Sequence, residues 1–284
     1  MDLELRDIRA SDFDRLVPLV SPFLCDPSQH EALRAMWTEI IRSKCGVTNV
    51  AADVEQSSII HFFFAVFVSD GRADEYHQCR HPSIARRLLA EWVAGERPFL
   101  HADEIARANA GSGLNLVLMQ YGGRRGDPRA HIANYEGSRR AIRGWDLRTF
   151  TVEKFTEPHH DDRGWGRSLG YRVLEYPPDE LRAAGFAKDR APFLWAATRR
   201  DAEFNPGYAT ALLFKTYAAP RFAFTPGEQR VLGLALDGAT DSSVARAVGI
   251  SESAVKKHFR TVYEKVHAVG IFDPLVDGAE PAQF

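Results

Sequence analysis

The spacing of hydrophobic residues divides the chain into a helical opening, a strand-rich middle and a helical end. Between residues 10 and 45, apolar side chains recur three and four positions apart, which predicts helices that are interrupted at Pro22 and Pro27. A β-branched and aromatic run at 58–69 predicts a buried strand. A further helix is expected at 83–95, with its apolar residues on one face.

From residue 113 onward the pattern changes to one of strands. Apolar runs are separated by clusters of Gly, Pro and Asp, and a short helix is expected at 179–184. Helices followed by mostly sequential strands are typical of an α+β domain with a largely antiparallel sheet. The predicted strands are 114–121, 143–155, 168–176, 192–198 and 208–217.

A change in hydrophobic period marks a domain boundary near Pro220. Proline cannot continue a ladder, and beyond this point the period switches from 2 to 3.6. The sequence therefore predicts an α+β sensor or dimerisation domain at 1–219, an all-α domain at 222–272 and a tail at 273–284.

The all-α segment carries the signals of a helix-turn-helix. Thr225 and Glu228 have the spacing of a capping box at the start of a first helix. A second helix, capped by Thr240 or Asp241, leads to Gly249, which suits a left-handed turn. A third helix begins after Ser251 and presents basic residues opposite its core face, as a recognition helix would.

Residues 225–266 resemble the LuxR-type (LuxR/FixJ) helix-turn-helix. The resemblance implies a sequence-specific, DNA-binding transcriptional regulator that acts as a homodimer, with double-stranded DNA as its partner. It departs from the family pattern at Ser242, Ser243 and Glu264. The positions that match are Thr225, Pro226, Glu228, Val231, Leu232, Gly238, Ala245, Ile250, Ser251, Val255, Lys256, His258, Tyr263 and Lys265. The DNA-binding residues that it implies are Ser251, Ser253, Lys256, Lys257, Arg260 and Lys265.

The part before residue 220 leaves several functions open. Its size and strand-rich second half are similar to those of GAF and PAS sensor domains, which would add a small-molecule effector as a partner. A domain that only dimerises or recruits RNA polymerase is a further alternative. The segment 162–169 resembles the loop by which GNAT acetyltransferases hold the pyrophosphate of acetyl-CoA, and the opening residues 4–20 resemble that family's first strand and helix. The alternatives are thus a GNAT-like N-acetyltransferase fused to a DNA-binding module, or a domain that only dimerises.

Metal and catalytic sites are not expected. His77, Cys79 and His81 alternate in one segment, and 159–162 carries two histidines and two aspartates, but solvated loops explain both patterns better than ligand sets do. No Ser/His/Asp or paired-carboxylate arrangement can be asserted from the spacing. The chain is therefore predicted to be no enzyme and to hold no cofactor and no metal.

Composition and charge limit the location more than the function. The net charge of −2 does not by itself indicate a nucleic-acid-binding protein, but a whole-chain average hides local charge, and the basic residues of interest lie on one helix. The three cysteines, Cys25, Cys45 and Cys79, form no disulfide framework, which indicates a reducing cytoplasm. The charged N-terminus is unlike a signal peptide, and the apolar run Ile59–Val68 is too short to cross a bilayer.

Overall fold

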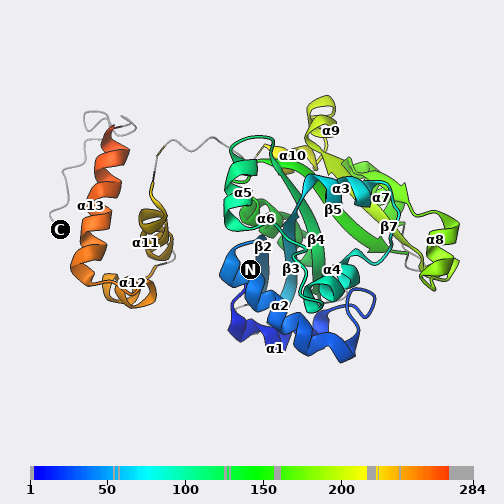
Figure 1. The fold of residues 1–284 in the computed structure, drawn as a ribbon, viewed down its shortest axis with the longest axis horizontal. Helices are drawn as coiled ribbons and strands as arrows, with labels where there is room; N and C mark the ends of the chain where they lie inside the picture. Colours follow the sequence, from blue (N-terminus) through cyan, green and yellow to red (C-terminus); the bar gives the residue numbers. More distant parts are fainter. Residues whose placement is uncertain are drawn as a thin grey trace. The chain divides into compact units, whose positions relative to one another are not determined.

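The computed structural model describes the chain in two compact units, Met1–Ala218 and Ala219–Phe284 (Figure 1). Each unit is considered by itself. The residues described are 3–53, 55–56, 58–124, 127, 129–156, 161–215, 222, 224–236 and 238–268.

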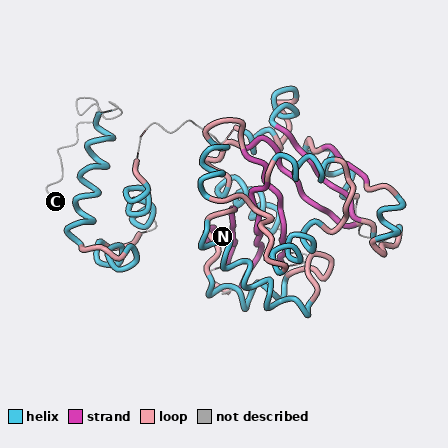
Figure 2. Tube along the Cα trace, in the orientation of Figure 1, coloured by secondary structure: helices cyan, strands magenta, loops and turns pink. Residues whose placement is uncertain are grey.

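The first unit is built on one seven-stranded sheet, drawn in magenta in Figure 2. The strands follow the order β1-β2-β3-β4-β5-β7-β6. Neighbouring strands are antiparallel except β4 and β5, which run parallel. The strands are β1 (Leu3–Arg6), β2 (Gly46–Asp53), β3 (Ser58–Val68), β4 (Leu114–Gly123), β5 (Leu147–Phe155), β6 (Arg172–Glu175) and β7 (Pro192–Thr198).

Helices connect these strands and flank the sheet. In the described part of the first unit, two α-helices precede β2, namely α1 (Phe13–Leu16) and α2 (His30–Ser43), and three precede β4, namely α3 (Asp70–His77), α4 (Ile84–Val93) and α5 (Ala102–Asn109). One helix precedes each of the next three strands along the chain: α6 (Arg129–Ala141) before β5, α7 (Asp162–Leu169) before β6 and α8 (Pro178–Ala183) before β7. Two more follow β7, namely α9 (Arg199–Phe204) and α10 (Ala211–Phe214), and short 3-10 turns supplement these helices.

Aromatic packing fixes α2 on one face of the sheet. The Trp37 ring stacks on Phe64 at a centroid distance of 4.2 Å and meets Phe62 edge-on at 6.1 Å. Its indole N–H donates to the Gln120 side-chain oxygen at 3.2 Å in a fully buried position. Because strand side chains alternate, Phe63 of the same strand points to the opposite face.

Helix α6 lies on that opposite face, close to β1, β2 and β3. Gly137 in the middle of α6 rests directly on the side-chain amide of Asn49 in β2, and a Cβ at this position would collide with that amide. Asn49 is paired with Phe63 in the sheet register, which places both on the α6 face. A glycine is therefore needed here so that the helix can approach the sheet.

The predicted fold class is wrong, because the sheet is mixed rather than largely antiparallel. We expected an α+β N-terminal domain with a largely antiparallel sheet and an all-α helix-turn-helix C-terminal domain, whereas the chain has one mixed seven-stranded sheet flanked by helices. A parallel pair needs a crossover, and the sequence analysis missed the crossover helix α6. The predicted strand at 192–198 is confirmed, whereas 208–217 contains turns and α10, and 168–176 contains the end of α7 and β6.

The described part of the second unit forms three helices, α11 (Pro226–Leu236), α12 (Asp241–Val248) and α13 (Glu252–Ala268), each in contact with the other two. Their small core is formed by Val231, Val244, Ala245 and Val255. The predicted caps are present: the Thr225 backbone N–H donates to Glu228, and Gly249 adopts a left-handed φ of 74°. The predicted tail at 273–284 lies outside the described residues.

No helix in the described parts of either unit has the length and apolar character that a bilayer crossing requires.

The buried Trp37–Gln120 hydrogen bond offers a test of the core. Trp37→Phe leaves the Gln120 oxygen without its donor, and the Gln120 amide nitrogen already lacks a partner among the described residues. We expect a loss of about 2–3 kcal/mol in the free energy of unfolding, measured by urea titration. Adding Gln120→Met removes the orphaned amide, so the double variant should recover about 1–2 kcal/mol relative to the sum of the single changes. Additive losses would contradict this account.

Candidate functional site

The parallel strands β4 and β5 separate part of the way along the sheet. Their pairing ends at Leu118 and Val152, yet β4 continues to Gly123 and β5 to Phe155. Beyond that point β4 pairs only with β3, and β5 only with β7. We call the space between Met119–Gly123 and Glu153–Phe155 the strand gap. The main-chain groups that line it have no strand partner on the inner side within the described residues.

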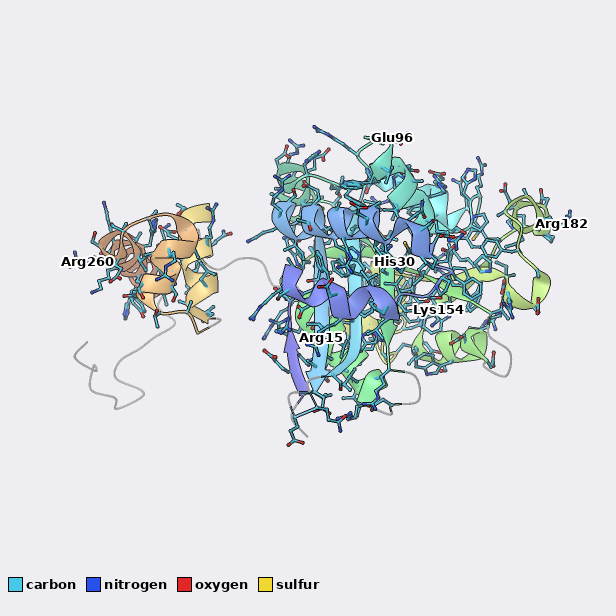
Figure 3. All side chains as sticks on the ribbon, turned by 90° about the horizontal axis from the view of Figure 1, so that it is seen from below. Arg15, His30, Glu96, Lys154, Arg182 and Arg260 are labelled. Carbon is cyan, nitrogen blue, oxygen red and sulfur yellow. The ribbon has the colours of Figure 1, made fainter. Side chains whose placement is uncertain are left out.

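Three side chains gather at the strand gap on the α6 face of the sheet. The Tyr121 hydroxyl donates to the Glu153 main-chain oxygen at 3.0 Å and so bridges the two strands. The Lys154 ammonium lies 5.2 Å from the centroid of the Tyr121 ring and 5.0 Å from that of Trp195. Lys154, labelled in Figure 3, also lies 4.0 Å from the carboxylate of Asp162. The gap therefore holds a cation between two aromatic faces.

The chain leaves β4 through glycines and arginines before it enters α6. Gly122 and Gly123 end the strand, and Arg124 is exposed, with one hydrogen bond of 3.1 Å to Gln56. Arg129 opens α6, and its guanidinium pairs with Asp53 at 2.6 Å and with Asp127 at 2.8 Å. Its backbone N–H donates to the Asp127 carboxylate at 2.9 Å. A strand followed by a glycine-containing loop and a helix is an arrangement that brings backbone N–H groups and the positive end of a helix toward an anion. Residues 125, 126 and 128 lie outside the described residues.

The segment 162–169, expected as the acetyl-CoA loop, is instead helix α7 after β5. The Asp161 side chain caps this helix and accepts from the Gly164 N–H at 2.8 Å. A carboxylate thus already occupies the position that a phosphate would take. The two glycines serve packing: a Cβ at Gly164 would collide with Asp161, and one at Gly166 with the Trp195 ring. The structure therefore contradicts a phosphate role for these glycines.

On the other face of β5, alternate polar residues fasten the helices inserted between β3 and β4. The Thr149 hydroxyl donates to Asn115, whose amide donates to Asp70 at the start of α3. Thr151 bonds to the His77 ring at 3.0 Å. Glu153, two residues further, accepts from the backbone N–H groups of Ser83 and Ile84 where α4 begins, at 2.8 and 2.9 Å. We call Thr149, Thr151 and Glu153 the polar ladder.

Glu153 is the ionisable member of the polar ladder, and its surroundings shift its pKa. Its carboxylate is buried, and desolvation raises its pKa to about 7, although three donors oppose that shift. One of them is the Tyr176 hydroxyl, at 2.8 Å. Burial, together with this carboxylate, raises the pKa of Tyr176 well above its usual value. Glu153 therefore holds α4 against the sheet and changes its charge near neutral pH.

The predicted histidine and cysteine patterns do not converge. The His77 ring bonds to Thr151, Cys79 is buried and free, and His81 lies 3.6 Å from Glu75. Burial raises the pKa of the Cys79 thiol to about 11. Of the pattern at 159–162, the two histidines lie outside the described residues. Across the described ranges, no three side chains of His, Cys, Asp or Glu gather as metal ligands do.

The residues expected to bind DNA lie on α13 and its cap. Ser251 caps the helix by accepting from the Ala254 N–H at 3.2 Å, and its hydroxyl lies 2.9 Å from that of Ser253. Lys256, Lys257 and Arg260 are exposed, and Arg260 is labelled in Figure 3. Exposure is compatible with many roles, so the DNA contacts stay a prediction and form no part of the function proposed below.

Lys265 has a structural role that the sequence analysis did not foresee. Its ammonium lies 2.7 Å from the Glu228 carboxylate, which is itself nearly buried and also accepts from the Thr225 N–H. Lys265 and these hydrogen bonds lower the pKa of Glu228. The pair therefore joins the end of α13 to the start of α11.

The sequence analysis missed the residues of the strand gap and the polar ladder. A signal was present in β5, where Thr149, Thr151 and Glu153 alternate with Phe150 and Val152. A period of two with polar residues on one side usually marks a solvent-facing strand. Here both faces are covered, so the same pattern marks buried hydrogen bonding.

Comparisons with known proteins found similarity among solved structures alone: no protein-family model and no curated protein matches the chain. An N-acetyltransferase from Staphylococcus aureus Mu50 has 10% identity and a TM-score of 0.41, covering 70% of this chain and 99% of that one. A variant of the spermidine/spermine N-acetyltransferase of Vibrio cholerae has 10% identity and a TM-score of 0.43, covering 72% and 98%. The polyamine N-acetyltransferase of Drosophila melanogaster has 15% identity and a TM-score of 0.40, covering 69% and 100%.

These findings contradict the prediction of a LuxR-type transcriptional regulator. No family model matches the segment 222–272 or any other part of the chain. The predictions that the chain is no enzyme and that double-stranded DNA is its main partner are likewise not borne out: the three structures named above are those of acetyltransferases. The physical reason lies in the matching residues, because many of them, such as Thr225, Glu228 and Val255, form caps and core.

The raised pKa of Glu153 predicts a pH-dependent stability. The Glu153 carboxyl has a pKa of about 7 in the folded chain and about 4.5 in the unfolded chain. Its contribution to the free energy of unfolding is therefore fully present below pH 4.5 and is lost as the pH rises through 7. Between pH 5 and pH 8, wild type should lose roughly 2–3 kcal/mol relative to Glu153→Gln in urea unfolding. The exposed Asp179→Asn is the matched control. Parallel curves for Glu153→Gln and wild type would contradict the assignment.

The Lys265–Glu228 pair predicts a local effect in the second unit. Lys265→Met leaves a nearly buried carboxylate without its cation, whereas Lys257→Met on the same helix removes an exposed charge. We expect the first change to lower the protection of α11 and α13 amides in hydrogen exchange by about 1–2 kcal/mol, and the second to leave it unchanged. Equal effects of the two variants would show that the pair does not hold the helices together.

Proposed function

We propose that the first unit is an acyltransferase that binds an acyl-coenzyme A in the strand gap and transfers the acyl group to an amine. The observation that carries this proposal is the separation of β4 and β5 after Leu118 and Val152. Backbone groups along a free strand edge favour an extended ligand that carries amides of its own. The pantetheine arm of coenzyme A is such a ligand, because it is extended and contains two amide groups.

The two ends of the strand gap support the orientation of the cofactor. Gly122 and Gly123 end β4 and Arg124 follows it, and the exposed Arg124 side chain would attract the phosphate groups through its positive charge. The first N–H of α6 already donates to Asp127, so the helix start is not assigned to them. The thioester would then lie deeper, toward Leu118 and Val152, where the strands meet. This placement differs from the predicted one at 162–169, because that segment is α7 and follows β5 rather than β4.

The proposed chemistry is acyl transfer with a thiol leaving group. The lone pair of the acceptor nitrogen attacks the thioester carbonyl carbon, the C–N bond forms and the C–S bond breaks. The acceptor nitrogen loses one proton and the departing sulfur gains one. The Tyr121 hydroxyl, held in the strand gap by the Glu153 main-chain oxygen, is the candidate proton donor to the sulfur.

Lys154 is the candidate group that contacts the cofactor from β5. Its ammonium lies between the Tyr121 and Trp195 rings and could donate to a carbonyl oxygen of the pantetheine arm. The acceptor class is left as an amine, since the described residues indicate no narrower choice. A cytoplasmic location belongs to the same proposal and is supported by three free, buried cysteines.

The test is a titration of the full-length chain with acetyl-CoA by calorimetry, followed by a thiol-release assay with a panel of amines. We expect saturable binding of acetyl-CoA that Lys154→Met weakens about tenfold. Lys44→Met should leave the affinity unchanged, because Lys44 is exposed at the end of α2 and is not part of the strand gap. Tyr121→Phe should lower kcat with little effect on binding, because the hydroxyl acts on the leaving group.

Two outcomes would overturn the proposal in different ways. No saturable binding of acetyl-CoA would remove the ligand and the function together. Binding without acylation of any amine would remove the transfer step and leave a binding protein for the cofactor. Hydrogen exchange of the Met119–Gly123 and Glu153–Phe155 amides would locate the ligand, because they gain partners only if it lies in the strand gap.

A further inference from the structure

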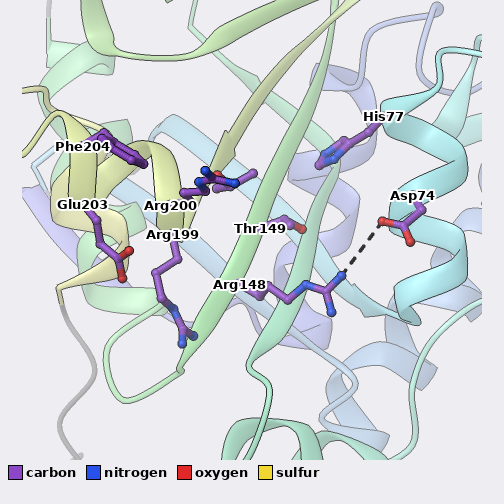
Figure 4. A pocket seen from close by; sticks show the side chains of 9 residues that line it. Asp74, His77, Arg148, Thr149, Arg199, Arg200, Glu203 and Phe204 are labelled. Atoms are coloured by element: carbon purple, nitrogen blue, oxygen red, sulfur yellow. Dashed lines mark ion pairs between the residues drawn. The ribbon is translucent and has the colours of Figure 1, made fainter.

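A separate pocket lies at the opposite end of β5 from the strand gap. It has a volume of about 570 Å³ and lies between α3, the first residues of β5 and α9 (Figure 4). Cavities of roughly 300–1,000 Å³ are the usual size for small-molecule sites. We call it the α9 pocket; the lining residues used below are Asp74, His77, Arg148, Arg200, Glu203 and Phe204.

The arginines of the α9 pocket differ in how far they are already neutralised. Arg148 pairs with Asp70 at 2.8 Å and with Asp74 at 4.0 Å. The neighbouring Arg199 pairs with Asp146 at 2.6 Å and also donates to the Leu147 main-chain oxygen. Arg200, by contrast, makes no ion pair with any described residue, and its guanidinium lies 5.6 Å from the Phe204 ring centroid. Arg200 is therefore the cation that remains available to a ligand.

His77 on α3 and Arg200 on α9 both line the pocket, as Figure 4 shows. One ring nitrogen of His77 bonds to Thr151 of the polar ladder, which fixes the ring. Burial, Arg172 and Arg148 lower the pKa of His77, against the opposing effect of Asp74 and Asp201. The ring is thus neutral at pH 7 and offers its other nitrogen for a hydrogen bond.

The remaining lining residues indicate what else the ligand carries. Asp74 on α3 and Glu203 on α9 place carboxylates on opposite walls, which disfavours a polyanion and favours a ligand with an ammonium group. Phe204 is 72% exposed and forms an apolar wall beneath Arg200. The pocket therefore offers partners for a ligand that carries an anionic group, a cationic group and an apolar surface.

We propose that the α9 pocket binds a free α-amino acid with an apolar or aromatic side chain. Its carboxylate bonds to Arg200 and to the His77 ring, since a guanidinium fork suits a carboxylate in two-point contact. Its ammonium faces Asp74 or Glu203, and its side chain packs on Phe204. This site shares no residue with the strand gap, so it stands independently of acyl transfer.

The test is calorimetric titration of the full-length chain with phenylalanine as the probe. Three comparators keep only part of its chemistry: 3-phenylpropionate lacks the amine, phenethylamine lacks the carboxylate, and inorganic phosphate keeps only an anionic charge. We expect phenylalanine to bind, and each comparator to bind at least about tenfold more weakly. Arg200→Ala should lose about tenfold or more in affinity, while Arg182→Ala, an exposed arginine on α8, should not change it.

Other results would overturn the proposal. Equal binding of 3-phenylpropionate would replace the amino acid with a simple carboxylate, and equal binding of phosphate would leave an unspecific anion site. Unchanged affinity in Arg200→Ala would place any bound phenylalanine elsewhere. Absence of binding by all four probes would leave the α9 pocket without the function argued here. Phe204→Ala adds a second measurement, since it should weaken phenylalanine binding while leaving the response to phosphate unchanged.

Discussion

The parallel pairing of β4 with β5 is the constraint on which the first unit depends. Because parallel neighbours need a crossover, the chain must leave the sheet and return through α6, which rests on β2 at Gly137. The pairing also sets where the sheet opens. Beyond Leu118 and Val152, β3 holds one strand and β7 the other, so the two cannot rejoin. The strand gap is thus a consequence of how the outer strands pair.

Strand β5 organises both candidate sites because its two faces serve different purposes. The polar ladder on one face ties α3 and α4 to the sheet, and the ring of His77 in the α9 pocket is oriented by one member of that ladder. The other face carries Lys154 into the strand gap. Since successive side chains point to opposite faces, nine residues of one strand can serve two sites without conflict. A polar residue moved by one position would lose its partner and lie on the wrong face.

The sequence predicts those elements whose own pattern decides their structure. The strand 192–198 has an uninterrupted apolar run, and the helices of the second unit have clear caps, so local signals are sufficient. Helix α6 was missed because Asn134 and Gly137 lie in its interior, and glycine weakens a helix unless tertiary contact requires it. The residue that requires a glycine at position 137 is Asn49, which lies far away in the sequence, in β2. The parallel pair, the strand gap and the α9 pocket all depend on such distant contacts, so they could not be derived from local pattern.

The second unit shows how a dense motif can mislead about function. Several of the residues that match the DNA-binding family are ones that any compact three-helix unit needs: Thr225 and Glu228 form a capping box, and Val231 and Val255 form the core. Lys265, which the resemblance implies as a DNA-backbone contact, also neutralises Glu228 within the unit. What would distinguish a recognition helix is its exposed residues, and these are the ones that packing leaves unconstrained. A resemblance carried by caps and core therefore supports an expectation about local structure, whereas function has to be argued from the groups that the fold leaves available to a ligand.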